Sequence, residues 1–109
     1  MRSFSFPLRE ALAALGLVAA QLPASAQDAA TLRQQALAAT CANCHGSNGR
    51  AVPGAAVPGL AGLPAAYVVE QMKAFKAGTR PATVMQQLAK GFSDAQIEQV
   101  AAYYAAQKP

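Results

Sequence analysis

The spacing of apolar and polar residues predicts helices and no strand of useful length. Near the C-terminus, apolar residues recur at the three- and four-residue intervals of one helix face. They are Ile97, Val100, Ala101 and Tyr104. Ser93 and Gln96 have the spacing of a capping box, in which two side chains satisfy backbone amides at the start of a helix. We therefore expect a helix from Ser93 to about Gln107, with those four residues buried.

Proline and glycine mark the limits of another predicted helix, over residues 64–78. Pro64 is favoured in a first helical turn, and Gly78 is a common terminator. Between them lies one apolar stripe, formed by Val68, Met72 and Phe75. We expect this stripe to be in the core. A short helical segment is expected over residues 82–90, ended by Gly91.

A first helix is predicted over about residues 29–40, followed by a long irregular loop. Leu32, Ala36 and Ala39 are spaced as one face of that helix. Residues 46–63 are rich in glycine and proline, which leaves little room for helix. A loop of this length inside a compact domain usually wraps around something.

The first 26 residues have the features of a cleaved secretory leader. Two arginines lie near the start, residues 11–20 are apolar, and residues 24–26 read Ala-Ser-Ala, a small-residue cleavage site. The apolar run is shorter than the roughly 20 residues needed to span a bilayer. We place the cleavage before Gln27, which leaves one domain over residues 27–109, exported to the periplasm without a transmembrane anchor.

Charge gives no reason to expect a nucleic-acid partner. The full chain carries nine Lys and Arg against five Asp and Glu, and residues 27–109 carry seven against four, a net charge of +3. This is less than nucleic-acid binding usually requires. A chain this short also builds only a small core from its own side chains, so we expect a metal, crosslink or cofactor to stabilise it.

Both cysteines of the chain fall in Cys41-Ala42-Asn43-Cys44-His45, a C-x-x-C-H pattern. At this spacing each thiol can add to one vinyl group of a porphyrin, while the next residue presents its imidazole to the iron. We therefore predict one haem c, attached covalently through Cys41 and Cys44, with His45 as an iron ligand.

Three other uses of the cysteine pair agree less well with the sequence. A zinc site needs two more ligands, and the chain has no further cysteine or histidine. A thioredoxin-like redox pair follows a strand, whereas this pair follows an alanine-rich helical segment. A structural disulfide would close a very short loop and would leave His45 unexplained.

Several segments, besides the C-x-x-C-H pattern, resemble class I cytochromes c. They read Val-Pro-Gly-Leu-Ala-Gly over residues 57–62, Ala-Lys-Gly-Phe-Ser-Asp over 89–94 and Ala-Ala-Tyr-Tyr-Ala over 101–105. The similarity covers residues 30–107 and extends to small soluble bacterial monohaem members and to the cytochrome subunit of flavocytochrome c sulfide dehydrogenases. It implies an all-α class I cytochrome c fold, a small helical domain wrapped around one covalently attached haem.

The resemblance also implies particular contacts. In this family a proline carbonyl accepts a hydrogen bond from the proximal histidine, and Pro58 stands at the matching place. Such a bond fixes the histidine tautomer and raises its basicity as a ligand. The first and last helices cross in this family, which would pair Leu32 and Ala36 with residues 100–104. Candidates for contacts with the haem propionates are Arg50, Arg80 and Tyr67.

Two methionines remain after leader cleavage as candidates for the sixth iron ligand. Met72 lies on a predicted buried stripe, so we expect its side chain to be committed to packing. Met85 lies between Pro81 and Gly91 and matches the family's ligand position. We therefore predict that Met85 is the second axial ligand; water or Lys90 in its place is the alternative.

Iron held by His45 and Met85 has no open position for a substrate, which favours a one-electron carrier over an enzyme. We expect periplasmic shuttling between a donor, a dehydrogenase or quinol-oxidising complex, and an acceptor, an oxidase or another cytochrome. A second hypothesis is a haem c subunit of a sulfide- or sulfite-oxidising dehydrogenase complex. A gas-binding or peroxidatic haem protein would require an absent or labile sixth ligand.

Covalent attachment can be tested by mass. Protein made with a cytochrome c maturation system should have the intact mass of residues 27–109 plus one haem, because thioether bonds survive denaturation. Acid-acetone should leave the haem on the chain. Extraction of the haem into the solvent would contradict the assignment of Cys41 and Cys44.

Overall fold

The structure is a computed structural model that describes residues 24–109. The chain divides into two units between Thr31 and Leu32, and the apolar core and the C-x-x-C-H motif lie within the second. The predicted leader, residues 1–26, lies outside the described residues except for its last three, so its cleavage stays a prediction. Within the described part, no helix combines the length and apolar character needed to cross a membrane.

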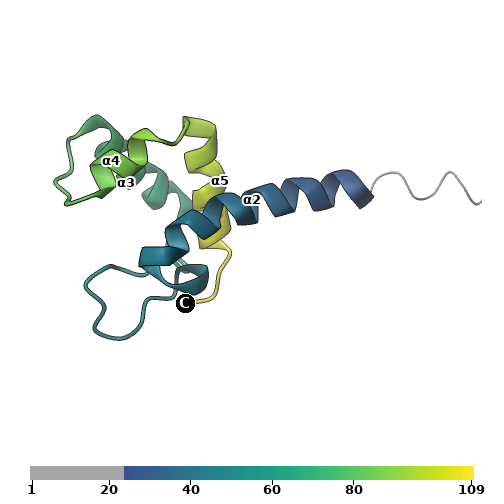
Figure 1. Ribbon diagram of the computed structural model, residues 1–109, viewed down its shortest axis with the longest axis horizontal. Coiled ribbons are helices and arrows are strands. Elements are labelled where there is room, and N and C mark those ends of the chain that lie inside the picture. Colours follow the sequence, from purple (N-terminus) through teal and green to yellow (C-terminus); the bar gives the residue numbers. More distant parts are fainter. Residues whose placement is uncertain (1–23) are drawn as a thin grey trace, which may run out of the picture. The chain divides into compact units, whose positions relative to one another are not determined.

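The described residues form helices and no strands, as the apolar spacing predicts. In chain order the elements are α2 (Ala24–His45), the 3-10 helix η1 (Ser47–Gly49), α3 (Ala65–Ala77), α4 (Met85–Lys90) and α5 (Asp94–Ala105) (Figure 1). The all-α fold class is therefore confirmed.

Local sequence signals set the ends of α3 and α5. The Ser93 hydroxyl accepts from the Gln96 amide at 3.2 Å, and the Gln96 side chain accepts from the Ser93 amide at 2.9 Å. This is the predicted capping box. Gly78 ends α3 with a positive φ of 78°, a conformation that glycine adopts without a steric penalty. The predicted C-terminus of α5, near Gln107, was two residues too far, since α5 ends at Ala105.

The first helix differs from its prediction in length and in buried face. α2 continues through the C-x-x-C-H motif to His45, five residues beyond the predicted end. Leu32 is 63% exposed and Ala36 is also exposed, so the expected pairing of these two residues with α5 is wrong. Ala38 is fully buried instead. An alanine-rich helix has little apolar asymmetry, so its buried face is set by the shape of its partner, here the large side chain of Tyr104.

Two apolar clusters form the core of residues 32–109, and α5 contributes to both. One, the α3–α5 cluster, joins α5 to α3 and α4 and consists of Val68, Met72, Ala89, Ile97 and Ala101. The other joins α5 to α2 and consists of Ala38, Val100 and Tyr104. All four residues of the predicted α5 face are buried. The stripe predicted for α3 is confirmed for Val68 and Met72, while Phe75 is partly buried against them.

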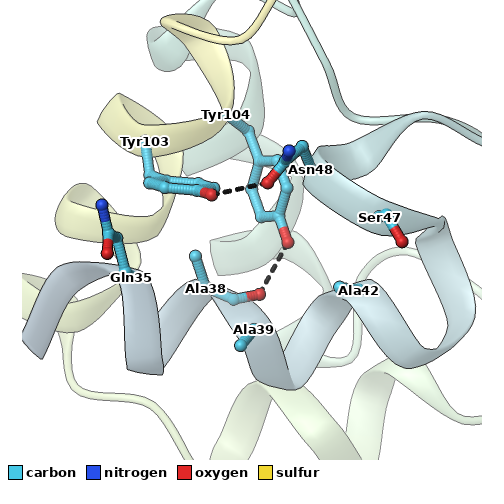
Figure 2. A pocket seen from close by; sticks show the side chains of 8 residues that line it. All are labelled: Gln35, Ala38, Ala39, Ala42, Ser47, Asn48, Tyr103 and Tyr104. Atoms are coloured by element: carbon cyan, nitrogen blue, oxygen red, sulfur yellow. Dashed lines mark hydrogen bonds between the residues drawn. The ribbon is translucent and has the colours of Figure 1, made fainter. Parts of the chain in front are cut away.

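Tyr104 makes the buried polar contact between the first and last helices, and Gln34 Nε2 also donates to the Gln99 carbonyl at the exposed side of their contact, at 3.0 Å. Its side chain is fully buried, and its hydroxyl donates to the Ala38 carbonyl at 2.6 Å (Figure 2). Burial raises the pKa of Tyr104, so the hydroxyl keeps its proton and remains a donor. The crossing of the first and last helices therefore exists, although through Ala38 rather than through Leu32 and Ala36.

Truncation of Ile97 should show how much the α3–α5 cluster contributes to the free energy of unfolding. Ile97→Ala removes a fully buried side chain and should lower the free energy of unfolding of the haem-loaded protein by about 2–5 kcal/mol. Leu32→Ala is the control, because an exposed side chain outside the core should change it by no more than about 0.5 kcal/mol. Denaturant unfolding measures both, and equal losses would contradict the placement of the core.

Candidate functional site

The C-x-x-C-H motif forms the last turns of α2. Cys41 is half-buried and Cys44 is exposed, and both are free thiols. Residues three apart in a helix lie on neighbouring positions of one face, so the two thiols are presented together. Burial raises the pKa of the Cys41 thiol. The disulfide considered from the sequence is not formed, and the strand that a thioredoxin-like pair would follow is not found among the described residues.

His45 is the last residue of α2, and one of its ring nitrogens is hydrogen-bonded to the loop over residues 46–63. Its side chain is buried, and Nδ1 lies 2.6 Å from the Pro58 carbonyl oxygen. A carbonyl only accepts, so Nδ1 carries the proton and donates. In the neutral ring this leaves the lone pair on Nε2, which is the atom able to bind a metal. The structure therefore brings Pro58 to the position that the resemblance implies.

Backbone hydrogen bonds hold the loop that presents Pro58. The Gly49 carbonyl accepts from the Leu60 amide at 2.8 Å and from the Ala61 amide at 3.1 Å. The Gly62 amide donates to the Tyr104 carbonyl in α5 at 2.9 Å. The three residues from Leu60 to Gly62 are thus fixed on two sides, immediately after the Pro58–Gly59 dipeptide.

Position 49 requires glycine because of both its backbone conformation and the atoms around it. Its φ is +76°, and a Cβ there would lie 2.7 Å from Tyr104 Cδ1 and 2.8 Å from the Ala61 nitrogen. Only glycine lets the Tyr104 ring and the loop approach the backbone this closely. The abundance of glycine in the loop was visible in the sequence, but its contact with α5 was not.

The two methionines occupy different environments. Met72 is 8% exposed and belongs to the α3–α5 cluster, as predicted. Met85 is the first residue of α4 and lies half-buried at the edge of the same cluster. It is preceded by residues 78–84, which form no helix. Met85 is therefore the less committed of the two thioethers.

Of the three candidates for propionate contacts, the two arginines make contacts elsewhere and Tyr67 is exposed. The Arg80 guanidinium donates to the Gln71 side chain and lies 4.6 Å from the centroid of the Phe75 ring. Arg50 Nε donates to the Lys108 carbonyl at 2.8 Å. Tyr67 is 46% exposed. These contacts with Phe75 and Lys108 had no signal in the sequence.

A cavity that sequence reasoning missed lies between α2, η1 and α5 (Figure 2). Its volume is about 230 Å³, and its lining consists of Gln35, Ala38, Ala39, Ala42, Ser47, Asn48, Tyr103 and Tyr104. The Tyr103 hydroxyl donates to Asn48 Oδ1 at 2.9 Å across it. None of Cys41, Cys44, His45, Pro58 and Met85 lines this cavity, which borders the motif only at Ala42.

The donor set fits a covalently bound haem better than a zinc ion. Among residues 24–109 no group of three His, Cys, Asp or Glu side chains gathers as a metal site. Two free thiols beside an imidazole with an oriented Nε2 are instead the groups that haem c attachment uses. Large apolar side chains are exposed in the loops and helices that follow the motif, namely Val52, Tyr67, Val84 and Leu88, as well as at Leu32 in α2. Such side chains suit contact with an apolar porphyrin.

Fold and site together define an all-α haem protein of the electron-transfer class. The cytochrome c family model matches residues 30–107, and the chain belongs to that family. Haem c, attached through Cys41 and Cys44, is accordingly the cofactor of this protein. Membership also places residues 30–107 among the electron-transfer domains of the cytochrome c family.

Two named relatives and one solved structure show what the chain is similar to. The thiosulfate dehydrogenase electron acceptor of Thiomonas intermedia is 41% identical over 109 residues, covering 100% of this chain and 48% of the relative. The cytochrome subunit of sulfide dehydrogenase from Chlorobaculum tepidum is 33% identical over 72 residues, 66% of this chain and 64% of that protein. The cytochrome c4 structure from Acidithiobacillus ferrooxidans has a TM-score of 0.57 at 41% identity, covering 61% of this chain and 37% of that one. This chain thus spans about half the length of the Thiomonas protein.

Two glycines with nearly equal φ angles allow the loop contact to be tested. Gly49→Ala meets both left-handed strain and overlap with Tyr104, whereas a Cβ at Gly54, with φ +78°, meets nothing within 4 Å. Gly54→Ala should therefore cost about 1 kcal/mol of unfolding free energy, and Gly49→Ala about 1–3 kcal/mol more. Thermal unfolding of the haem-loaded variants measures both. Equal losses would show that Gly49 does not hold the loop against α5.

Proposed function

We propose that this protein is a periplasmic one-electron carrier in which His45 and Met85 are the axial ligands of the haem iron. The observation that carries the proposal is the 2.6 Å hydrogen bond from His45 Nδ1 to the Pro58 carbonyl, directly after the two cysteines. A hydrogen bond to one ring nitrogen is how proteins orient a histidine whose other nitrogen binds a metal. Bound there, the haem supplies an iron couple that exchanges one electron at a time.

Met85 is favoured over Met72 because of how each is packed. The Met72 side chain is surrounded by the α3–α5 cluster, so turning its sulfur outward would open a cavity in the core. Met85 lies at the N-terminal end of a six-residue helix, next to a segment without helix, where small backbone adjustments are cheap. A thioether opposite an imidazole favours the ferrous state and leaves no position for a substrate.

The proposed donor is a sulfur-oxidising dehydrogenase of the thiosulfate dehydrogenase type. Support comes from the Thiomonas intermedia relative, named as the electron acceptor of such an enzyme and similar over the whole length of this chain. The proposed acceptor is an oxidase or another cytochrome. Residues 1–26 are proposed to direct export and to be removed before Gln27. Contacts with both partners would be brief, as is usual for electron carriers with small interfaces.

A second candidate is a fixed cytochrome subunit of a sulfide-oxidising dehydrogenase. The Chlorobaculum tepidum relative is named as such a subunit. A fixed subunit would need an apolar surface beside the haem edge, because permanent interfaces are more apolar than transient ones. The two candidates differ in whether the complex with the dehydrogenase survives purification.

The axial assignment can be tested by spectroscopy of two methionine variants. Met85→Ala should remove the weak red-region absorption band of ferric methionine-ligated haem and lower the midpoint potential, since a soft ligand is lost. Met72→Ala should keep the band and lower the free energy of unfolding by about 2–5 kcal/mol. Loss of the band in Met72→Ala alone would reverse the assignment, and absence of the band from the unmodified protein would point to Lys90 or water.

The donor can be tested by mixing the ferric protein with a thiosulfate dehydrogenase and thiosulfate. We expect rapid reduction, followed as the rise of the ferrous spectrum, and no reduction when thiosulfate is omitted. The two proteins should then elute separately in gel filtration. Co-elution as a stable complex would favour the subunit, and failure to reduce the protein would overturn the proposed donor.

A further inference from the structure

We propose that Tyr104 is a positioning residue that holds the helix carrying His45 and the loop carrying Pro58 in register with each other. The inference rests on the proposed ligation of iron by His45. It goes beyond that proposal because Tyr104 lies in α5 and contacts neither the motif histidine nor the loop proline through any hydrogen bond of the described residues.

On the helix side, Tyr104 is attached to α2 through its hydroxyl. The bond to the Ala38 carbonyl measures 2.6 Å and is buried. Ala38 lies seven residues before His45, close to two helical turns of 3.6 residues each. Fixing the helix at Ala38 therefore limits its rotation and sliding along the axis at His45.

On the loop side, Tyr104 acts through its backbone and its ring. Its carbonyl accepts from the Gly62 amide at 2.9 Å. Its ring lies against Gly49, whose carbonyl accepts from Leu60 and Ala61. The segment that follows Pro58 is thus attached to Tyr104 directly at Gly62 and indirectly through Gly49.

One residue consequently fixes both partners of the His45–Pro58 hydrogen bond. The donor is held through α2 and the acceptor through residues 60–62, so a shift of either relative to α5 lengthens the bond. A longer bond donates less electron density to the imidazole and destabilises ferric iron. Loosening Tyr104 is therefore expected to raise the midpoint potential, an effect that a loss of packing far from the site would not have.

Tyr103 provides a matched control in the adjacent position. Its hydroxyl also makes one hydrogen bond, to Asn48 Oδ1 at 2.9 Å, but its side chain is only half-buried. Its ring packs edge-on against that of Tyr104, with centroids 5.1 Å apart. Tyr103→Phe and Tyr104→Phe each remove one hydroxyl and keep one ring, so the chemical change is the same, while the buried contact with α2 is lost only in Tyr104→Phe.

The experiment compares these two variants as haem-loaded proteins. NMR measures the hydrogen exchange of the His45 Nδ1 proton relative to the Met72 amide in α3, which corrects for global stability, and a redox titration measures the midpoint potential. In Tyr104→Phe we expect relative exchange about fivefold faster than in Tyr103→Phe, together with a higher potential. If either quantity is the same in both variants, the proposal is overturned.

A measurement on the unmodified protein keeps the inference testable if Tyr104→Phe yields no folded haem protein. The His45 Nδ1 proton and the amides of Leu60, Ala61 and Gly62 should share one opening free energy, because Tyr104 holds them as a unit. Exchange of the His45 proton ahead of these amides would contradict the proposal. The hydrogen-exchange readout requires neither Met85 nor a redox partner, and a failure of His45 ligation would show separately as the absence of an imidazole-ligated haem spectrum.

Discussion

The fold depends on a small core in which helix α5 packs against α3 and α4 on one side and against α2 on another. The fully or nearly buried hydrophobic side chains of the described residues number eight, and three of them are alanine. A domain of this size gains little from burial alone and needs a further stabilising element. Helix α5 uses one side against α3 and α4 and another against α2, so the motif helix joins the core through Ala38 and few other residues. We expect covalent attachment of haem at the end of that helix to add the missing stabilisation.

The site likewise uses few side chains. The His45 imidazole needs a fixed tautomer, and the protein obtains it from a backbone carbonyl at Pro58 rather than from a buried charge. A carbonyl carries no ionisable proton, and its burial here is offset by the hydrogen bond that it accepts from the ring. What the carbonyl does need is a rigid loop. Gly49 and Gly62 provide that rigidity because they let the loop bond closely to itself and to α5.

Much of the architecture could be predicted from the sequence, because strong local signals coincided with tertiary burial. The Ser93 capping box and the α5 face are clear examples, as is Gly78 at the end of α3. The alanine-rich segment before Cys41 carries almost no apolar asymmetry, and there the wrong face was predicted. The Pro58 contact came from resemblance, since no rule of local spacing links residues 13 apart. The roles of Gly49 and Tyr104 depend on contacts across more than 50 residues, which a single sequence does not encode visibly.

The central claim is that this chain folds as a haem c protein because its own core is insufficient. Far-ultraviolet circular dichroism of thermal unfolding tests it most directly, with the haem-loaded protein compared with the haem-free Cys41→Ala/Cys44→Ala chain. The account predicts one sharp transition for the haem-loaded protein and, for the double variant, a weak helical signal that declines without a cooperative transition. A haem-free double variant with native helix content and a cooperative transition would contradict it.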